Sequence, residues 1–288
     1  MVTPKYEMIN ETTDCHTGAV LYRIRALRDF AHIRKGDLGG FIESERNLEH
    51  HGMCWVDHEA RVYGEAVIRD KAIVRDTASV GDRAMVADSA TICHSAWVKD
   101  DATVSGQAMV ASGARVQQQA LVTDKAFVFG HAIVQGTSKI QDSAQIIDQA
   151  MLGGNASISN NARVYGNARV EQCSVVSGNA TVGHYAHIFA NATITGNAKV
   201  IGNAVVCGKA KITDGAKLRE NCEVTDQAQV IENAQVRGNA MVATSAMVRG
   251  ESIIDGETVL KEDEIVGPAP EPLKVFQDDK STPESLFF

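Results

Sequence analysis

Hydrophobic residues recur every six positions over most of this chain. Stepping by six from Val56 to Val266, every position is valine, isoleucine or leucine, which makes 36 in succession. The residue two before each aliphatic, from Cys54 to Ser252, is always alanine, serine or cysteine. The residue two after, beginning at His58, is glycine at 13 of 34 positions and aspartate at 10. The repeating unit is therefore a small residue, an aliphatic residue and a turn-forming residue, each followed by a variable one.

This spacing predicts short β-strands and excludes helices. Successive side chains of a strand point to opposite faces, so Ala162 and Val164 face one side while Arg163 and Tyr165 face the other. The glycine or aspartate that follows can turn a corner, because positive φ is free for glycine and tolerated by aspartate. A helix is excluded because inward spacings of two and four do not match a 3.6-residue stripe.

Strands this short cannot bury an apolar face alone, so the hexads are expected to stack on one another. Three hexads per coil form a triangular prism of about 12 coils, in which residues 18 apart lie in one vertical column. All five prolines lie outside the repeat, where each would have removed a ladder hydrogen bond. The fold class predicted is all-β, a single-stranded parallel β-helix.

The repeat resembles that of the bacterial hexapeptide-repeat superfamily. Leu21–Leu27, Gly36–Gly40 and Cys54–Val56, followed directly by the repeat, further resemble the YdcK-like acetyltransferases. The resemblance implies a left-handed β-helix and a trimeric acyltransferase that uses acyl-CoA or acyl-carrier protein. Two features depart from the family: glycine falls one residue later in the hexad, and no long loop interrupts the repeat.

The chain divides into three parts by pattern. Residues 1–50 lie before the repeat and are expected to cap its end, with a hairpin between Tyr6–Ile9 and Leu21–Leu27 and a turn at the glycine-rich Lys35–Phe41. Residues 51–266 form the β-helix. Residues 267–288 form a proline-rich tail, whose apolar pieces either lie on a solenoid face or remain unstructured.

Composition limits the classes of partner and the cellular location that are expected for the protein. The net charge of −8 offers no basic surface, so neither nucleic acid nor membrane is an expected partner. The chain has no run of 18 apolar residues and no secretory signal pattern at its start, so a cytoplasmic location is expected. The six cysteines show no CxxC pair, and reduced thiols are expected.

The outward columns predict an apolar stripe on one face of the prism. Such a stripe on a soluble protein indicates a partner surface, and a second copy of the chain is the commonest partner. We therefore expect a homo-oligomer, a trimer by resemblance or else a dimer, and a strictly monomeric mass at micromolar concentration would exclude it. The expected interface residues are Trp55, Ile73, Met109, Phe127, Phe129, Ile147 and Ile201.

Histidine supplies the candidate catalytic chemistry. His131, His184 and His187 fall along one edge of the prism, and acyl transfer needs a general base that works near neutral pH. Nearby aromatic residues are candidates for binding the acyl donor: Tyr165, Tyr185 and Phe189. The alternative is that the corner histidines are ordinary turn residues. No metal site is expected, because His184 and His187 lack a visible third ligand.

The function predicted is acetyl transfer from acetyl-CoA to a small acceptor, with no permanently bound cofactor. The competing hypothesis is a non-catalytic rod or scaffold, which the uninterrupted repeat favours. A minor alternative is an ice- or sugar-binding surface, because one face carries hydroxyl residues such as Thr103, Ser157 and Thr193, although Lys139 and Lys211 interrupt the rows. Corner asparagines are expected to form structural ladders between coils: Asn161, Asn179 and Asn197, and Asn203, Asn221 and Asn239.

Overall fold

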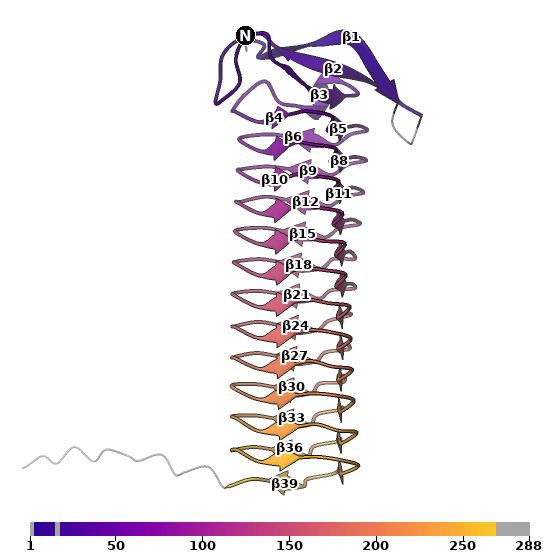
Figure 1. Ribbon diagram of the computed structural model, residues 1–288, viewed down its shortest axis with the longest axis vertical. Helices are drawn as coiled ribbons and strands as arrows, with labels where there is room; N and C mark the ends of the chain where they lie inside the picture. Colours follow the sequence, from indigo (N-terminus) through magenta and orange to yellow (C-terminus); the bar gives the residue numbers. More distant parts are fainter. Residues whose placement is uncertain (1–2, 15–17, 269–288) are drawn as a thin grey trace, which may run out of the picture.

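The computed structural model describes residues 3–14 and 18–268, and these form one parallel β-solenoid with a cap at its N-terminal end (Figure 1). Two-residue strands begin every six residues from β4 (Trp55–Val56) to β39 (Ile265–Val266). They are distributed over three sheets, so each coil contributes one strand to each sheet. The predicted all-β solenoid with three hexads per coil is confirmed.

We number the three faces in the order in which the chain enters them. Face 1 contains β4 (Trp55–Val56), β7 (Ile73–Val74), β10 (Thr91–Ile92), β13 (Met109–Val110), β16 (Phe127–Val128), β19 (Gln145–Ile146), β22 (Arg163–Val164), β25 (Thr181–Val182), β28 (Lys199–Val200), β31 (Lys217–Leu218), β34 (Gln235–Val236) and β37 (Ile253–Ile254). Face 2 contains β5 (Arg61–Val62), β8 (Ser79–Val80), β11 (Trp97–Val98), β14 (Arg115–Val116), β17 (Ile133–Val134), β20 (Met151–Leu152), β23 (Arg169–Val170), β26 (His187–Ile188), β29 (Val205–Val206), β32 (Glu223–Val224), β35 (Met241–Val242) and β38 (Val259–Leu260). Face 3 contains β6 (Val67–Ile68), β9 (Met85–Val86), β12 (Thr103–Val104), β15 (Leu121–Val122), β18 (Lys139–Ile140), β21 (Ser157–Ile158), β24 (Val175–Val176), β27 (Thr193–Ile194), β30 (Lys211–Ile212), β33 (Gln229–Val230), β36 (Met247–Val248) and β39 (Ile265–Val266).

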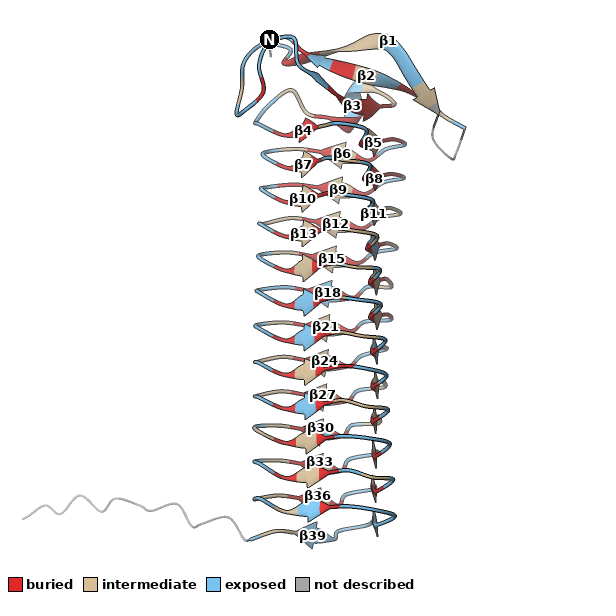
Figure 2. Ribbon diagram, in the orientation of Figure 1, coloured by how far each residue is buried: buried red, intermediate tan, exposed pale blue. Residues whose placement is uncertain are grey.

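Stacked strands pair in parallel, and each residue lies opposite the one that is three hexads further along the chain. Gln145 lies opposite Arg163, and Ile146 lies opposite Val164. The inward residues from Cys54 to Val248 are fully buried, as Ala162 and Val164 are, and buried positions recur from coil to coil (Figure 2). The core is therefore a narrow axis of small and aliphatic side chains that runs the length of the solenoid.

The corners are held by side chains that reach one coil along the axis. Each corner residue has left-handed backbone, and in many coils its amide is bonded by the side chain at the same corner of the preceding coil. For example, the Gln118 amide donates to Asp100 Oδ2 at 2.8 Å. The predicted asparagine ladders are also present, with Asn161 bonded to Asn179 at 3.1 Å and Asn203 to Asn221 at 2.8 Å. Polar corner residues therefore stabilise the stack.

The N-terminal cap continues the sheet of face 2. β1 (Tyr6–Asp14) and β2 (Val20–Ala26) form an antiparallel hairpin, and β2 also pairs antiparallel with β3 (Leu38–Ile42). β3 then runs parallel to β5, so the cap passes directly into the solenoid. A 3₁₀ turn, η1 (Glu45–Asn47), follows β3. Leu48 bridges to Ile68 in parallel, so residues after β3 make a further, incomplete coil.

The expected turn at Lys35–Phe41 is partly wrong, because its second half is β3. Gly39 and Gly40 lie in this strand, where the first coil comes very close. A Cβ on Gly39 would lie 2.6 Å from Trp55, and one on Gly40 would lie 2.5 Å from the Ala60 carbonyl oxygen. The two glycines therefore allow the backbone of the cap to approach the prism closely.

The cap also corrects one expected interface residue. Trp55 was expected on an outward stripe, but it is only 1% exposed. The rings of Tyr6 and Phe30 pack against it edge-on, at centroid distances of 6.5 Å and 5.3 Å. Trp55 thus anchors the cap to the first coil and is not available to a partner.

Beside Trp55, the cap buries a charged side chain. Lys5 is fully buried, and its Nζ donates to the Cys54 carbonyl oxygen at 2.8 Å. Burial lowers the pKa of Lys5, and burial raises the pKa of the Cys54 thiol. The inward cysteine is therefore part of the packing beneath the cap.

The proline-rich tail falls mostly on residues 269–288, which lie outside the described residues. Within residues 3–14 and 18–268, no helix is long and apolar enough to cross a membrane.

Candidate functional site

The sequence placed three histidines along one edge, and the structure gives them different surroundings. His184 lies at the corner between faces 1 and 2, with an exposed side chain and φ of 60°. Its Nδ1 accepts a hydrogen bond from the Gly202 amide at 3.4 Å, one coil further on. His58 and His94, in the same corner column, accept the amides of Asp76 and Ser112 in the same way. His184 therefore acts as a corner ladder residue, because the nitrogen that would accept a proton faces the backbone.

His131 is separated from the other two. Its side chain is exposed at the same edge. It shares a column with Tyr185 and lies three coils before it, a distance of about 14 Å at the spacing of stacked strands. Its ring packs over Gly113, where an added Cβ would lie 2.5 Å from Nδ1. The structure does not bring His131 to His187.

His187 begins β26 on face 2, with Tyr185 in the turn before this strand and Phe189 directly after it. Tyr185, His187 and Phe189 alternate with the buried Ala186 and Ile188, so all three point outward in one row. The rings of His187 and Phe189 are 4.6 Å apart between centroids, and the Tyr185 side chain is 66% exposed. Three residues predicted from the sequence therefore share one surface.

A carboxylate completes this surface. Glu171, from the preceding coil, has Oε2 2.9 Å from His187 Nε2. Both side chains are about one third exposed, at 35% and 36%. A carboxylate accepts from Nε2–H, so this pairing leaves the lone pair on Nδ1. A histidine oriented by a carboxylate is the arrangement that general bases use.

One basic residue borders the pair. Arg169, in β23, is the register partner of His187 in the parallel sheet and is exposed to solvent. A guanidinium group presents a planar fork of donors that suits a phosphate. We call Arg169, Glu171, Tyr185, His187 and Phe189 the face 2 cluster.

The sequence analysis did not identify Glu171 or Arg169. Arg169 occupies the same column as His187, one coil earlier, so reading that column would have found it. Glu171 is 16 residues before His187, so the two residues are diagonal neighbours in successive coils. Finding Glu171 requires both the coil length and the alternation of outward residues along the chain. The three-hexad coil was therefore a sufficient signal for Arg169, whereas for Glu171 it gives the position but not the direction of the side chain.

Tyr165 belongs to a different surface. Its ring lies edge-on to His184 at 5.5 Å and covers Gly183, where an added Cβ would lie 2.1 Å from ring carbons. The Arg163 guanidinium lies 5.5 Å from the ring centroid. Tyr165 therefore packs on its own prism at the corner between faces 1 and 2, away from the Glu171 pairing.

The apolar stripe of face 1 remains on the surface below the cap. Phe127 and Phe129 stack with ring centroids 5.4 Å apart, and Phe129 is 38% exposed. The other residues expected in the interface are partly exposed: Ile73, Met109, Ile147 and Ile201.

The two inward cysteines fill core positions. Cys222 is fully buried, and burial raises the pKa of its thiol to about 12. It therefore stays protonated at neutral pH and does not act as a nucleophile.

Comparison with known proteins identifies the repeat. Residues 156–172 and 162–178 match the family model described as the YdcK β-solenoid repeat, which confirms the resemblance seen in the sequence. This stretch includes Arg169 and Glu171. No curated protein sequence matches the chain.

Solved structures of two acyltransferases are similar at low identity. The UDP-N-acetylglucosamine acyltransferase of Francisella novicida is 16% identical, with a TM-score of 0.29, over 66% of this chain and 66% of that chain. The UDP-N-acetylglucosamine acyltransferase from Campylobacter jejuni is 19% identical, with a TM-score of 0.23, over 65% of this chain and 69% of that chain. The alignment spans just under two thirds of the Francisella enzyme.

Proposed function

We propose that this protein transfers an acetyl group from acetyl-CoA to a small acceptor at the face 2 cluster, with His187 as general base. The observation that carries the proposal is the 2.9 Å contact between His187 Nε2 and Glu171 Oε2. Glu171 holds the imidazole at Nε2, which leaves Nδ1 to take the proton of an acceptor hydroxyl or amine. The chain's YdcK-type repeat supports the same reaction class.

The reaction assigns a role to each group. His187 Nδ1 takes the proton of the acceptor as its oxygen or nitrogen attacks the thioester carbonyl carbon. The carbon–sulfur bond then breaks, and the imidazolium returns the proton to the leaving CoA thiolate. Glu171 does not touch the substrates and is a positioning residue, because its carboxylate stabilises the imidazolium that forms between the two steps.

The surroundings of His187 suit the donor. Arg169 is one coil away and supplies a guanidinium for the CoA phosphates. Tyr185 and Phe189 flank His187, and the exposed ring of Tyr185 and the partly exposed ring of Phe189 offer surfaces on which an adenine can stack. Of the residues predicted to bind the donor, we retain Tyr185 and Phe189, and we replace Tyr165 with Arg169.

We further propose that the protein forms a homo-oligomer through the apolar stripe of face 1, without Trp55. Phe127 and Phe129 form a stacked pair at the centre of this stripe. Face 2 shares an edge with face 1. An acetyl-CoA molecule bound at the face 2 cluster can therefore extend to the place where two prisms meet.

Binding of acetyl-CoA is the first test. A donor that binds only the folded state at about 100 times its Kd adds about 2.7 kcal/mol to the unfolding free energy, and the melting temperature rises accordingly. We expect this rise in the wild type and its loss in Arg169→Ala. Lys211→Ala is the matched control, because it removes an exposed basic residue from face 3.

A non-catalytic scaffold is the second candidate function. The observation that favours it is the regular repeat, because strands begin every six residues from β4 to β39 and no inserted loop interrupts this spacing. If millimolar acetyl-CoA does not change the melting temperature of the wild type, the scaffold function replaces the enzymatic one.

A further inference from the structure

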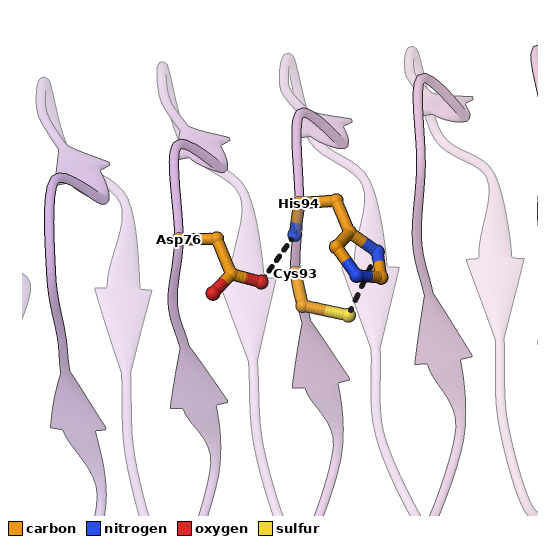
Figure 3. A group of neighbouring side chains, drawn as sticks. All are labelled: Asp76, Cys93 and His94. Atoms are coloured by element: carbon orange, nitrogen blue, oxygen red, sulfur yellow. Dashed lines mark hydrogen bonds between the residues drawn. The ribbon is translucent and has the colours of Figure 1, made fainter.

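A second group of reactive side chains lies near the cap, several coils away from the face 2 cluster. Asp76, Cys93 and His94 lie at the corner between faces 1 and 2, in two successive coils (Figure 3). One ligand atom from each lies within 4.8 Å of the others, and Cys93 Sγ is 3.8 Å from His94 Nδ1. Among the described residues, this is the one group that brings three such side chains together.

A further histidine lies in the coil before, outside this group. His58 stands in the same corner column, one coil before Asp76, and its Nδ1 is 3.4 Å from Asp76 Oδ1. His58, Asp76 and His94 therefore form a vertical file of imidazole, carboxylate and imidazole, with the Cys93 thiol beside its last member. From these positions we propose that Asp76, Cys93 and His94 form a binding site for a thiophilic divalent cation such as Zn²⁺, with a water molecule as its fourth ligand.

The ligand types select the metal class. Thiolate and imidazole are preferred by Zn²⁺, whereas Ca²⁺ and Mg²⁺ take oxygen ligands. At Zn–S and Zn–N distances of about 2.3 and 2.0 Å, tetrahedral ligand atoms lie about 3.5 Å apart. The observed 3.8 Å between Cys93 Sγ and His94 Nδ1 therefore needs only a small adjustment.

The charges balance at the site. Burial raises the pKa of the Cys93 thiol, so the thiol is protonated before the metal arrives. Binding replaces the S–H bond with an S–Zn bond and releases one proton to solvent. One thiolate and one carboxylate then neutralise the two charges of Zn²⁺. The guanidinium of Arg75 lies beside the thiol and must turn away, and Arg75 lines a surface hollow with His58.

The corner ladder alone does not account for the thiol. His94 Nδ1 accepts the Ser112 amide at 3.4 Å, as His184 Nδ1 accepts that of Gly202, so both histidines share the ladder role and His94 must give up this long hydrogen bond to bind the cation. His184, however, follows Gly183, and the residue one coil before it is Gly166. The equivalent positions around His94 hold a buried thiol and a carboxylate. His184 is therefore an internal comparison that has the ladder without the ligands.

Cobalt spectroscopy tests the site, because Co²⁺ is a coloured substitute for Zn²⁺. Titrating the full chain with Co²⁺ should give one equivalent bound, with a near-ultraviolet thiolate-to-cobalt band and the intense visible bands of tetrahedral coordination. Zn²⁺ should then bleach the spectrum. Cys93→Ser should remove the thiolate band, while Cys173→Ser should keep it, because Cys173 is an exposed cysteine outside the cluster.

A second variant separates metal binding from folding. His94→Asn keeps the corner, because Asn160 has the same left-handed backbone and accepts the Gly178 amide at 3.2 Å. It should leave the circular dichroism spectrum unchanged and weaken Co²⁺ binding by about 100-fold or more, because it removes a ligand, whereas loss of an outer-shell partner alone costs about 10- to 100-fold. The site is disproved if the wild type shows no thiolate band at millimolar Co²⁺, or if the band survives in Cys93→Ser.

Discussion

Replacing His187 with alanine is expected to lower kcat for acetyl transfer by about 10²- to 10⁴-fold, the contribution of a positioned general base. The variant loses the nitrogen that removes the acceptor proton and leaves Arg169 in place. The KM for acetyl-CoA should therefore change little. The measurement is release of free CoA thiol from acetyl-CoA with a panel of small amines and alcohols as acceptors.

Two further variants test whether the loss of kcat depends on the pairing of His187 with Glu171. Glu171→Gln keeps a hydrogen-bond acceptor for Nε2–H but removes the charge, so kcat should fall while the KM for acetyl-CoA is retained. His184→Asp is the matched control, since Asp148 in the same corner column already accepts the Gly166 amide at 3.0 Å. His184→Asp should keep wild-type turnover. Equal losses in His184→Asp and His187→Ala would contradict the assignment of the base.

Replacing Ile146 with alanine is expected to destabilise the solenoid by about 2–5 kcal/mol. Ile146 is fully buried on the axis, between the strands of neighbouring coils. A stacked coil contacts only its neighbours, so the cavity weakens both interfaces of that coil. The free energy of unfolding, obtained from urea denaturation followed by circular dichroism, measures this loss.

The adjacent residue provides the control for this change. Gln145 belongs to the same strand, β19, but points outward and is exposed. Gln145→Ala should change the unfolding free energy by about 0.5 kcal/mol or less. If the two substitutions had similar effects, the inward and outward assignments of this strand would be wrong.

The solenoid could be predicted from sequence because one period sets both local and long-range structure. Alternation within a hexad decides which side chains face the axis, as for Ala162 and Val164, and the stacking of coils then follows without any further choice. The asparagine ladders were predictable for the same reason. Asn161 and Asn179 are 18 residues apart and so had to meet once three hexads made a coil.

The cap was harder to predict because it has no period. Trp55 occupies an outward position of the first hexad, and that position predicts exposure. Its burial depends on Tyr6 and Phe30, which reach it through the hairpin and the following loop. Gly39 and Gly40 suggested a turn by composition, although the structure uses them for close contact between two backbones.

The candidate sites fell between these two cases. His187, Tyr185 and Phe189 were found because histidines and aromatic residues cluster there within one coil. Glu171 was missed because it lies on a diagonal, where a long side chain crosses from one coil to the next. Side-chain direction at such positions depends on rotamers that no sequence period encodes.

The three-hexad coil underlies the face 2 cluster, the corner ladders and the proposed metal site, and cross-linking tests it directly. Gln145 and Arg163 are register partners on face 1, whereas Ser157 lies in β21 on face 3. Cysteines introduced at 145 and 163 should form an intramolecular disulfide on mild oxidation, identified by peptide mass mapping. Cysteines at 145 and 157 should not. A disulfide in the second pair, or none in the first, would contradict the three-hexad coil.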